Sequence, residues 1–318
     1  MKKIILVALL LMMIAPVSSL MAQGAQSTAK TEYFPISVMI EPMVEPFPET
    51  ATLQATNQLL SLLAQNGIAS MSDNSQFVLT MFMVPQDKDV LPGPPMNIVE
   101  TMEANFYIAD VANKTIVATS AQTVKGMGRS ETRAYMDALK HLKLNTPAMK
   151  QFVEDGKRKI IAYYDNEAPT IIQRALVLSD AHSYEEALFM LMTIPSQCKH
   201  YQQALSSGLS VFKAMQDYTC VQNLQQARML WAAEQNATGA TKAGEYLAQI
   251  YPDAACYGDA MKLYSEIKGK VLDDWKFEMK KYQDGVNLEA QRIEAARAVG
   301  VAYGQHQQQQ TTNIGFLR

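Results

Sequence analysis

The spacing of apolar residues changes from a period of two to a period of 3.6 within residues 124–142, and from Asn145 onward the pattern is almost wholly helical. Before that point, alternating stretches rich in β-branched and aromatic residues predict strands, and the run QFVLTMFMV is apolar on both faces, as in a buried central strand. The predicted strands are 33–40, 76–84, 97–110 and 114–125, with a tight hairpin turn at Val111-Ala112-Asn113 joining the last two. The stretch PQDKDVLPGPP is predicted to be a loop because of its prolines and glycine.

Two helices are predicted among these strands. Residues 49–64 place leucines at helical spacing and stop at Asn66-Gly67. A second helix follows Ser130, with an apolar face made of Tyr135, Ala138, Leu139 and Leu142. The order β-α-β-β-β-α predicts a small, mostly antiparallel sheet whose apolar face is covered by the flanking helices.

The rest of the chain is helical in pattern, and the boundary is predicted at the Asn145-Thr146-Pro147 turn. A connecting helix is expected at 153–164, and Ala168-Pro169 is the expected start of the next one. Helical hairpins are predicted at 174–195, with a turn at His182-Ser183, and then at 201–236 and 238–261.

The last predicted helix, 260–302, carries one apolar stripe that must be covered. It would close the end of the helical stack or pair with another chain as a coiled coil. The fold class is therefore predicted to be α+β, with an α/β module at 33–145 followed by an all-α helical-hairpin domain at 146–302.

The two ends of the chain differ from the segments between them. Lys2 and Lys3 precede an apolar stretch and then small residues, a pattern typical of a cleavable secretory signal peptide. Cleavage is expected after Ala22, with Val17-Ser18-Ser19 as the competing site. A lipid anchor needs a cysteine directly after cleavage, and the first cysteine is Cys198, so we expect a periplasmic or secreted protein with no later membrane span. The predicted end segments are a signal peptide at 1–22, a polar tether at 23–32 and a disordered polar tail at 303–318.

Charge and cysteine content narrow the class of protein further. The formal net charge is -3, and loss of Lys2 and Lys3 lowers it by two, to -5, so nucleic-acid binding is not expected. Three cysteines, Cys198, Cys220 and Cys256, allow one disulfide and one free thiol in an oxidising compartment. The alternative is that each packs as a small apolar residue, and the sequence does not decide which two would pair.

Two parts of the chain resemble known architectures. The order of elements over 33–142, with Gly-x-Gly-x-Ser before a helix that carries Ala134 and Ala138, resembles the small α/β modules of Gram-negative envelope assembly proteins. The curli-secretion channel protein and the N-terminal part of the flagellar assembly protein FlgT are examples. Residues 166–261 resemble tetratricopeptide hairpins, in which small, aromatic and breaker positions recur, here Ala175, Ala181, Tyr184, Ala187, Leu188 and Pro195.

The stretch VKGMGRSETR comes closest to a phosphate-binding motif. It lacks the lysine of a P-loop, and Glu131 stands where a dinucleotide fingerprint requires a third glycine. Ser130 is suited to cap the helix, and Glu131 already supplies negative charge there. We therefore predict that Gly126 and Gly128 give the backbone the conformational freedom for a sharp turn from strand to helix, and that Ser130 is the N-cap. Arg129 is the one residue here that still favours a bound anion.

No residue pattern indicates catalysis, a cofactor or a metal. Cys198 and His200 form the one compact ligand pair, but zinc needs further close ligands, and residues two apart on a helix do not face each other. The adjacent carboxylates Glu185-Glu186 and Asp273-Asp274 are predicted to point in different directions and to be solvated.

We therefore expect a non-catalytic adaptor of the envelope, or a secreted one. Stacked helical hairpins leave a groove that binds peptides or partner helices, so a protein partner is expected, while the oligomeric state is not predicted. The candidate partner-binding residues are Tyr184, Tyr201, Trp231, Tyr246 and Trp275. The alternative is a periplasmic hydrolase whose site is assembled from residues distant in sequence.

Overall fold

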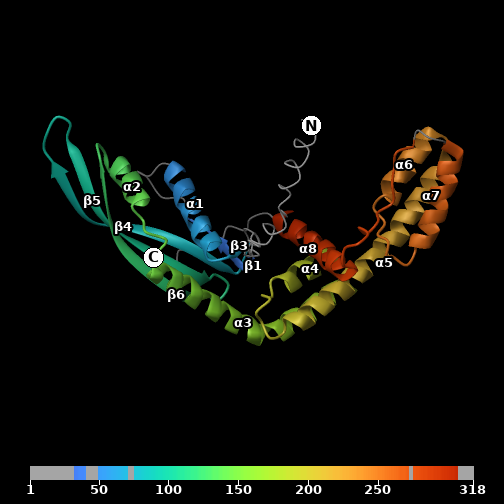
Figure 1. The fold of residues 1–318 in the computed structure, drawn as a ribbon, viewed down its shortest axis with the longest axis horizontal. Helices are drawn as coiled ribbons and strands as arrows, with labels where there is room; N and C mark the ends of the chain where they lie inside the picture. The colour runs from blue at the N-terminus through green and yellow to red at the C-terminus, as the bar shows by residue number, and fades with distance from the viewer. Residues whose placement is uncertain (1–31, 41–48, 71–74, 272–274, 307–318) are drawn as a thin grey trace, which may run out of the picture. The chain divides into compact units, whose positions relative to one another are not determined.

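The computed structural model describes residues 32–40, 49–70, 75–271 and 275–306 (Figure 1). These residues form an α+β protein, as predicted, with a small sheet region followed by a mostly helical region. The predicted signal peptide, nearly all of the polar tether and residues 307–318 of the predicted tail lie outside the described residues.

Strands of two small sheets make up the first part of the chain. Strand β1 (Glu32–Phe34) pairs in parallel with β3 (Ile68–Ser70), a short strand that the sequence pattern did not predict. The second sheet has the order β2-β4-β5-β6, with β2 parallel to β4 and the other pairs antiparallel. Its strands are β2 (Ile36–Val38), β4 (Phe77–Leu91), β5 (Asn97–Asp110) and β6 (Thr115–Gly128). The single strand predicted at 33–40 is thus divided between two sheets at Pro35.

The predicted loop that begins at Pro85 is wrong for its first seven residues. Strand β4 continues to Leu91 and stays paired with β5, with a shift of register between Pro85 and Asp87. Strand β2 pairs only with residues 77–79 of β4, so it does not cover the edge of β4 at Pro85. A proline is tolerated at a bulge or an uncovered edge because no ladder hydrogen bond is then lost.

Helices α1 (Glu49–Gln65), α2 (Glu131–Lys140) and α3 (Pro147–Asp180) pack against the sheet region. Alternate residues of β5, including Met102, Phe106 and Ile108, point into this core and are almost completely buried. The Phe106 ring lies 6.5 Å from that of Phe152 on α3. A side chain at Gly156 would place its Cβ 2.3 Å from Ile108 Cδ1, so this glycine lets α3 lie close to the sheet.

The glycines of the GxGxS stretch serve close packing, which corrects the predicted role of backbone latitude. Positive φ angles are recorded at Gly67, Gly93 and Gly285 but at neither Gly126 nor Gly128. A Cβ at Gly126 would lie 1.9 Å from the carbonyl oxygen of Ala134, on helix α2. Glycine is therefore required here because the backbone of α2 touches β6.

Helix α3 is one continuous helix, which corrects the prediction of two. It runs from Pro147 to Asp180, with Thr146 as its N-cap and Pro169 inside it. A proline in a helix removes one hydrogen bond, but it does not end the helix when both sides are held by packing. Ile160 and Ile172, on either side of Pro169, are both buried in the same core.

The remaining helices are α4 (Tyr184–Met192), α5 (Tyr201–Ala233), α6 (Ala237–Leu247), α7 (Tyr257–Val271) and α8 (Leu288–His306). Helix α4 contacts both α3 and α5, and α6 contacts both α5 and α7. The predicted turn at His182-Ser183 is confirmed, with His182 at a φ of 62°. The hairpin predicted at 201–236 is wrong because α5 runs unbroken through most of it, and Asn236 instead caps α6.

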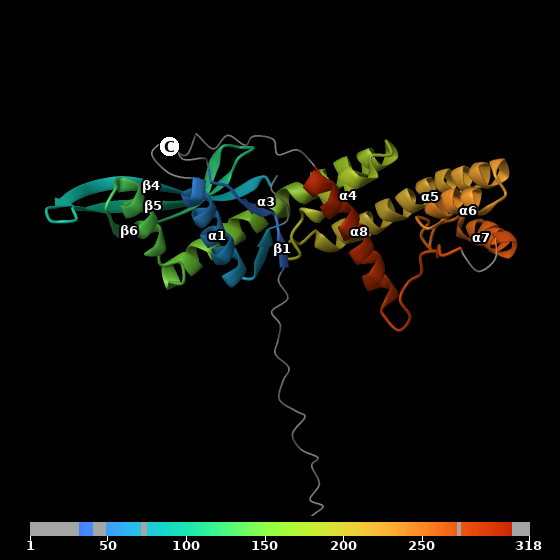
Figure 2. The same cartoon turned by 90° about the horizontal axis from the view of Figure 1, so that it is seen from above.

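The predicted helix 260–302 is also wrong, because the chain leaves the helix after Val271 and starts α8 only at Leu288. Gly285, at a φ of 77°, lies in the turn that leads into α8. Helix α8 packs against α4 (Figure 2) and continues past residue 303, where a disordered tail was predicted. The ring of Tyr303 lies 5.9 Å from that of Phe189 on α4.

The described residues form two large hydrophobic cores, to both of which α5 contributes, and a small third cluster of Val78 and Ala109 on the sheet. The first core extends from the sheet across α3 and α4 to Met215 in the first half of α5, so it includes residues on both sides of the predicted boundary at 145. The second begins at Cys220 and joins the second half of α5 to α6, α7 and the segment around Trp275 and Met279. Each core is thus built on one half of the same helix.

Candidate functional site: an exposed apolar stripe on α5

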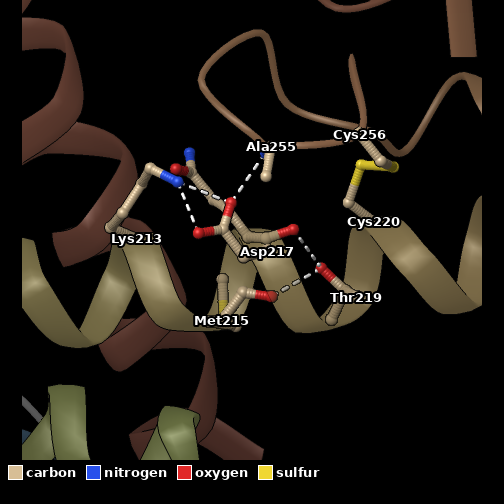
Figure 3. Close-up of a disulfide and its surroundings, with 8 residues drawn as sticks. Lys213, Met215, Asp217, Thr219, Cys220, Ala255 and Cys256 are labelled. Atoms are coloured by element: carbon tan, nitrogen blue, oxygen red, sulfur yellow. Dashed lines mark hydrogen bonds and ion pairs between the residues drawn. A yellow bond between two sulfur atoms is a disulfide. The ribbon is translucent and has the colours of Figure 1, made fainter. Parts of the chain in front are cut away.

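One side of α5 is bound covalently to the connection between α6 and α7. Cys220 and Cys256 form a disulfide, and Cys198 is free and buried. One turn earlier, Asp217 accepts a hydrogen bond of 2.7 Å from the backbone N–H of Ala255 and forms an ion pair with Lys213 (Figure 3). The connection before α7 is therefore fixed to α5 at two neighbouring points.

A carboxylate in the same connection binds α8. Arg292 donates two hydrogen bonds to Asp253, of 2.6 and 2.8 Å, and the hydroxyl of Tyr282 donates a third of 2.7 Å. The Arg292 guanidinium keeps the pKa of Asp253 below its usual value. Burial raises the pKa of the Tyr282 phenol, so it stays protonated and acts as a donor. This network is suited to holding three segments together, and it contains no activated nucleophile.

The opposite side of α5 presents a stripe of side chains to solvent. Tyr218, Val221 and Met229 are 39%, 60% and 50% exposed, and Gln225 is exposed between them. Their spacing of three, four and four residues places all four on one face of the helix. We call these four residues the α5 stripe. Its apolar members are flanked by an uncharged polar residue, Gln222.

The ring of Tyr218 is held in place by the turn between α3 and α4. His182 stacks on it with ring centroids 4.4 Å apart and an interplanar angle of 20°. His182 Nδ1 lies 2.8 Å from the hydroxyl oxygen of Tyr184, whose ring is in turn 5.7 Å from Tyr218. Burial raises the pKa of Tyr184, so its hydroxyl keeps its proton. The stripe therefore begins at a preorganised group of three rings.

The five predicted partner-binding residues do not form one cluster. Tyr184 lies beside the stripe, where it supports Tyr218. Trp231 and Trp275 are buried in the second core, and their indole N–H groups donate to Glu266 Oε1 and to the carbonyl oxygen of Ala240. Tyr201 and Tyr246 are half-buried. Buried rings present little surface to another protein. A partner-binding role for Trp231 and Trp275 stays a prediction, and neither residue belongs to the α5 stripe.

Sequence reasoning missed Tyr218, Val221 and Met229. Their helical spacing is visible in the sequence, but α5 also carries apolar residues on the faces that enter both cores. Periodicity alone could not identify the face left uncovered.

The other chemical candidates from the sequence are placed as follows. The thiol of Cys198 is buried, which raises its pKa, and it is hydrogen-bonded to the carboxylate of Asp165. His200 contacts it through a backbone N–H at 3.4 Å from Sγ, so no ring nitrogen is shown to activate it. Among the described residues, no three His, Cys, Asp or Glu side chains gather in a way that could hold a metal ion.

The N-terminus of α2 is capped by its own side chains. Ser130 Oγ accepts a hydrogen bond of 3.3 Å from the N–H of Arg133, which confirms the predicted cap. Glu131 forms an ion pair with Lys88 on β4. Asp137, six residues further along in the C-terminal half of α2, accepts a bond of 3.0 Å from the N–H of Met127. Glu131 already supplies the negative charge that a helix N-terminus attracts.

Comparison with known proteins gives little beyond this geometry. No family model and no curated protein matches the chain. A minor lipoprotein from Acinetobacter baumannii is similar at 17% identity, over 41% of this chain and 92% of its own, with a TM-score of 0.22. A protein named as a lipoprotein from Caulobacter crescentus CB15 is similar at 13% identity, over 40% of this chain and 84% of its own, with a TM-score of 0.20. Within the described ranges, no helix combines the length and apolar character that a membrane span needs.

Proposed function

We propose that the protein is an exported, non-catalytic adaptor that binds a protein partner through the α5 stripe. The observation that carries this proposal is the alignment of Tyr218, Val221 and Met229, all exposed, on one face of a helix, with the Tyr218 ring stacked on that of His182. Interaction sites are enriched in tyrosine and methionine and have a polar surround, and Gln222 and Gln225 supply such polar neighbours here. The sequence predicted that the partner binds in a groove between helical hairpins, whereas the proposed binding surface is the exposed face of one helix, α5.

Rigidity of the surface favours this role. Helix α5 is packed into two cores and bound through the Cys220–Cys256 disulfide, so a partner would not have to order it on binding. The stacking of His182 on Tyr218 restricts one of the contact side chains in the same way.

The disulfide also supports an exported location. Disulfides form and persist in oxidising compartments such as the periplasm and the exterior. An exported chain is what the N-terminal sequence predicts as well, and the two arguments are independent because they rest on different residues.

The proposal is tested by a charge placed in the stripe. A partner is first identified by crosslinking in the native host through a photoreactive residue at Gln225, and its affinity is then measured with purified proteins. Val221→Glu is expected to weaken binding more than tenfold, because a carboxylate would be desolvated in the contact. Gln226→Glu is the matched control, since Gln226 is exposed on α5 at a different angle.

Equal affinities for the two variants would refute the assignment of the stripe. Turnover in a broad hydrolase screen that survives extensive purification would instead favour the alternative of a hydrolase.

A further inference from the structure

The hairpin formed by β4 and β5 ends in an exposed turn that carries no charge. All residues from 90 to 96, with the sequence VLPGPPM, are exposed. Strand β6 ends at Gly128, opposite Ile98 of β5, and β2 pairs only with the first three residues of β4. The turn therefore extends beyond the neighbouring strands (Figure 1 and Figure 2), and we call residues 90–96 the hairpin tip.

The hairpin tip concentrates apolar side chains that water surrounds. The large ones are Val90, Leu91 and Met96, which are 52%, 46% and 52% exposed. In the described ranges, no other seven consecutive residues include three large apolar side chains that are exposed. Single exposed apolar residues are ordinary, whereas a contiguous group marks an interaction site.

The backbone of the hairpin tip has few groups that need water. Pro92, Pro94 and Pro95 have no N–H donor. The ladder with β5 continues to Leu91, which is paired with Asn97, and the Asn97 side-chain amide donates to the carbonyl oxygen of Pro95 at 3.4 Å. Hydrocarbon cannot pair with backbone N–H and C=O groups, so a segment that has few free ones enters it at a lower cost.

The charges behind the hairpin tip balance. Residues 87–89 of β4 and 129–133, which follow β6, contain three acidic and three basic residues. One of the basic residues, Arg129, comes directly after β6 and is exposed. Within the described part of the chain, its side chain forms no hydrogen bond or ion pair, whereas Lys88 pairs with Glu131. The base of the tip therefore offers a free guanidinium without a net charge.

We propose that the hairpin tip inserts into the surface of a bilayer of zwitterionic lipid, where Arg129 binds lipid phosphate. A guanidinium binds phosphate oxygens in pairs. Polybasic segments are typical of proteins that bind anionic lipid, so the balanced charges here favour a lipid without net charge. Residues 90–93 extend at most about 14 Å, which is enough to enter one leaflet but not to cross a hydrocarbon core of about 30 Å.

A protein partner fits the hairpin tip less well than a bilayer does. Contacts between proteins contain about one hydrogen bond per 100–200 Å². The three prolines leave the tip few donors for such bonds, and a bilayer requires none. The tip shares no residue with the α5 stripe, so this inference does not rest on the proposed function.

The test measures how much of the full chain floats with vesicles of phosphatidylcholine. The unaltered protein is expected to bind, and L91D/M96D to lower its partition coefficient at least about tenfold, because the carboxylates would have to leave water. The matched control is L53D/L60D, which places the same two charges at exposed leucines of α1 and should leave binding unchanged.

Arg129→Gln is expected to weaken binding several-fold, because it removes the phosphate contact but keeps the apolar tip. Arg228→Gln, at an exposed arginine of α5, is its control and should have no effect.

Tryptophan fluorescence shows whether the tip itself enters the lipid. Emission of M96W should move to shorter wavelength when vesicles are added, while V84W, at an exposed position of β4 behind the charged residues, should not change. Trp231 and Trp275 lie in the second core, so any change seen in the unaltered protein is subtracted.

Failure of the unaltered protein to float, equal binding of L91D/M96D, or unchanged emission of M96W would each overturn the proposal. Loss of a protein crosslink in L91D/M96D, with no vesicle binding by the unaltered protein, would assign the tip to a protein contact instead. Val221→Glu should leave vesicle binding unchanged, so this inference and the proposed function fail separately.

Discussion

Removing the Cys220–Cys256 disulfide should loosen the second core specifically. The bond closes a loop of 36 residues, and the chain-entropy relation then gives a stabilisation of about 4 kcal/mol at 25 °C. The hydrogen bond from Ala255 to Asp217 remains in a C220A/C256A variant, but a single bond contributes only about 1 kcal/mol. This hydrogen bond alone is therefore too weak to replace the covalent link.

Hydrogen exchange is the appropriate assay because it reports stability segment by segment. Amides of α6 and α7 in C220A/C256A should exchange up to about a thousandfold faster, which is the equivalent of about 4 kcal/mol. Amides of β4 and β5 belong to the other core and should change little. Cys198→Ala removes a buried thiol but keeps the disulfide, so it controls for loss of a cysteine side chain.

An acceleration below about fivefold in α6 and α7, or an equal one in the sheet, would refute the reasoning. A small acceleration would mean that the loop between Cys220 and Cys256 is already constrained without the disulfide. An equal acceleration in the sheet would mean that the two cores open together.

Three further predictions concern single residues. Gly126→Ala should destabilise the protein by about 3 kcal/mol in urea unfolding because its Cβ would overlap the backbone of α2, whereas Gly269→Ala, with open space around it, should be neutral or stabilising. Pro169→Ala should raise the melting temperature, because a backbone hydrogen bond of α3 would be restored, and a fall would contradict this. Asp253, whose pKa is lowered in the folded state by Arg292, stabilises the fold above its unfolded pKa of about 3.9 and loses this effect as the pH falls. Asp253→Asn should therefore show a smaller loss of stability between pH 5 and pH 3 than the unaltered protein, and equal slopes would argue against the ion pair.

The elements that sequence predicted best are those whose local pattern and tertiary role agree. The hairpin of β5 and β6 alternates cleanly because one face is buried, and Ser130 caps α2 because its position before the apolar stripe is unambiguous. Prediction failed where packing overrode a local signal. Pro85 lies inside a strand, and Pro169 inside a helix, because neighbouring strands and helices stabilise conformations that proline alone disfavours.

The candidate site was harder to predict for a different reason. Aromatic residues were expected to mark it, but Trp231 and Trp275 each make a hydrogen bond inside the second core. The stripe depends on which face of α5 stays uncovered once α4, α6 and α8 have packed. That information is held by contacts between distant segments and not by the spacing within α5 itself.

The sharing of α5 between two cores also limits how the protein can be cut. The point where one core gives way to the next, between Met215 and Cys220, lies in the middle of a helix. A protease would find no loop there, and a fragment ending at this point would expose an unfinished helix end. A fragment that begins with Tyr201 would keep the second core whole. It would, however, expose Val211 and Phe212, which are buried in the first core of the full chain. Fragments for expression are therefore best made by keeping α5 entire and replacing these two residues with polar ones.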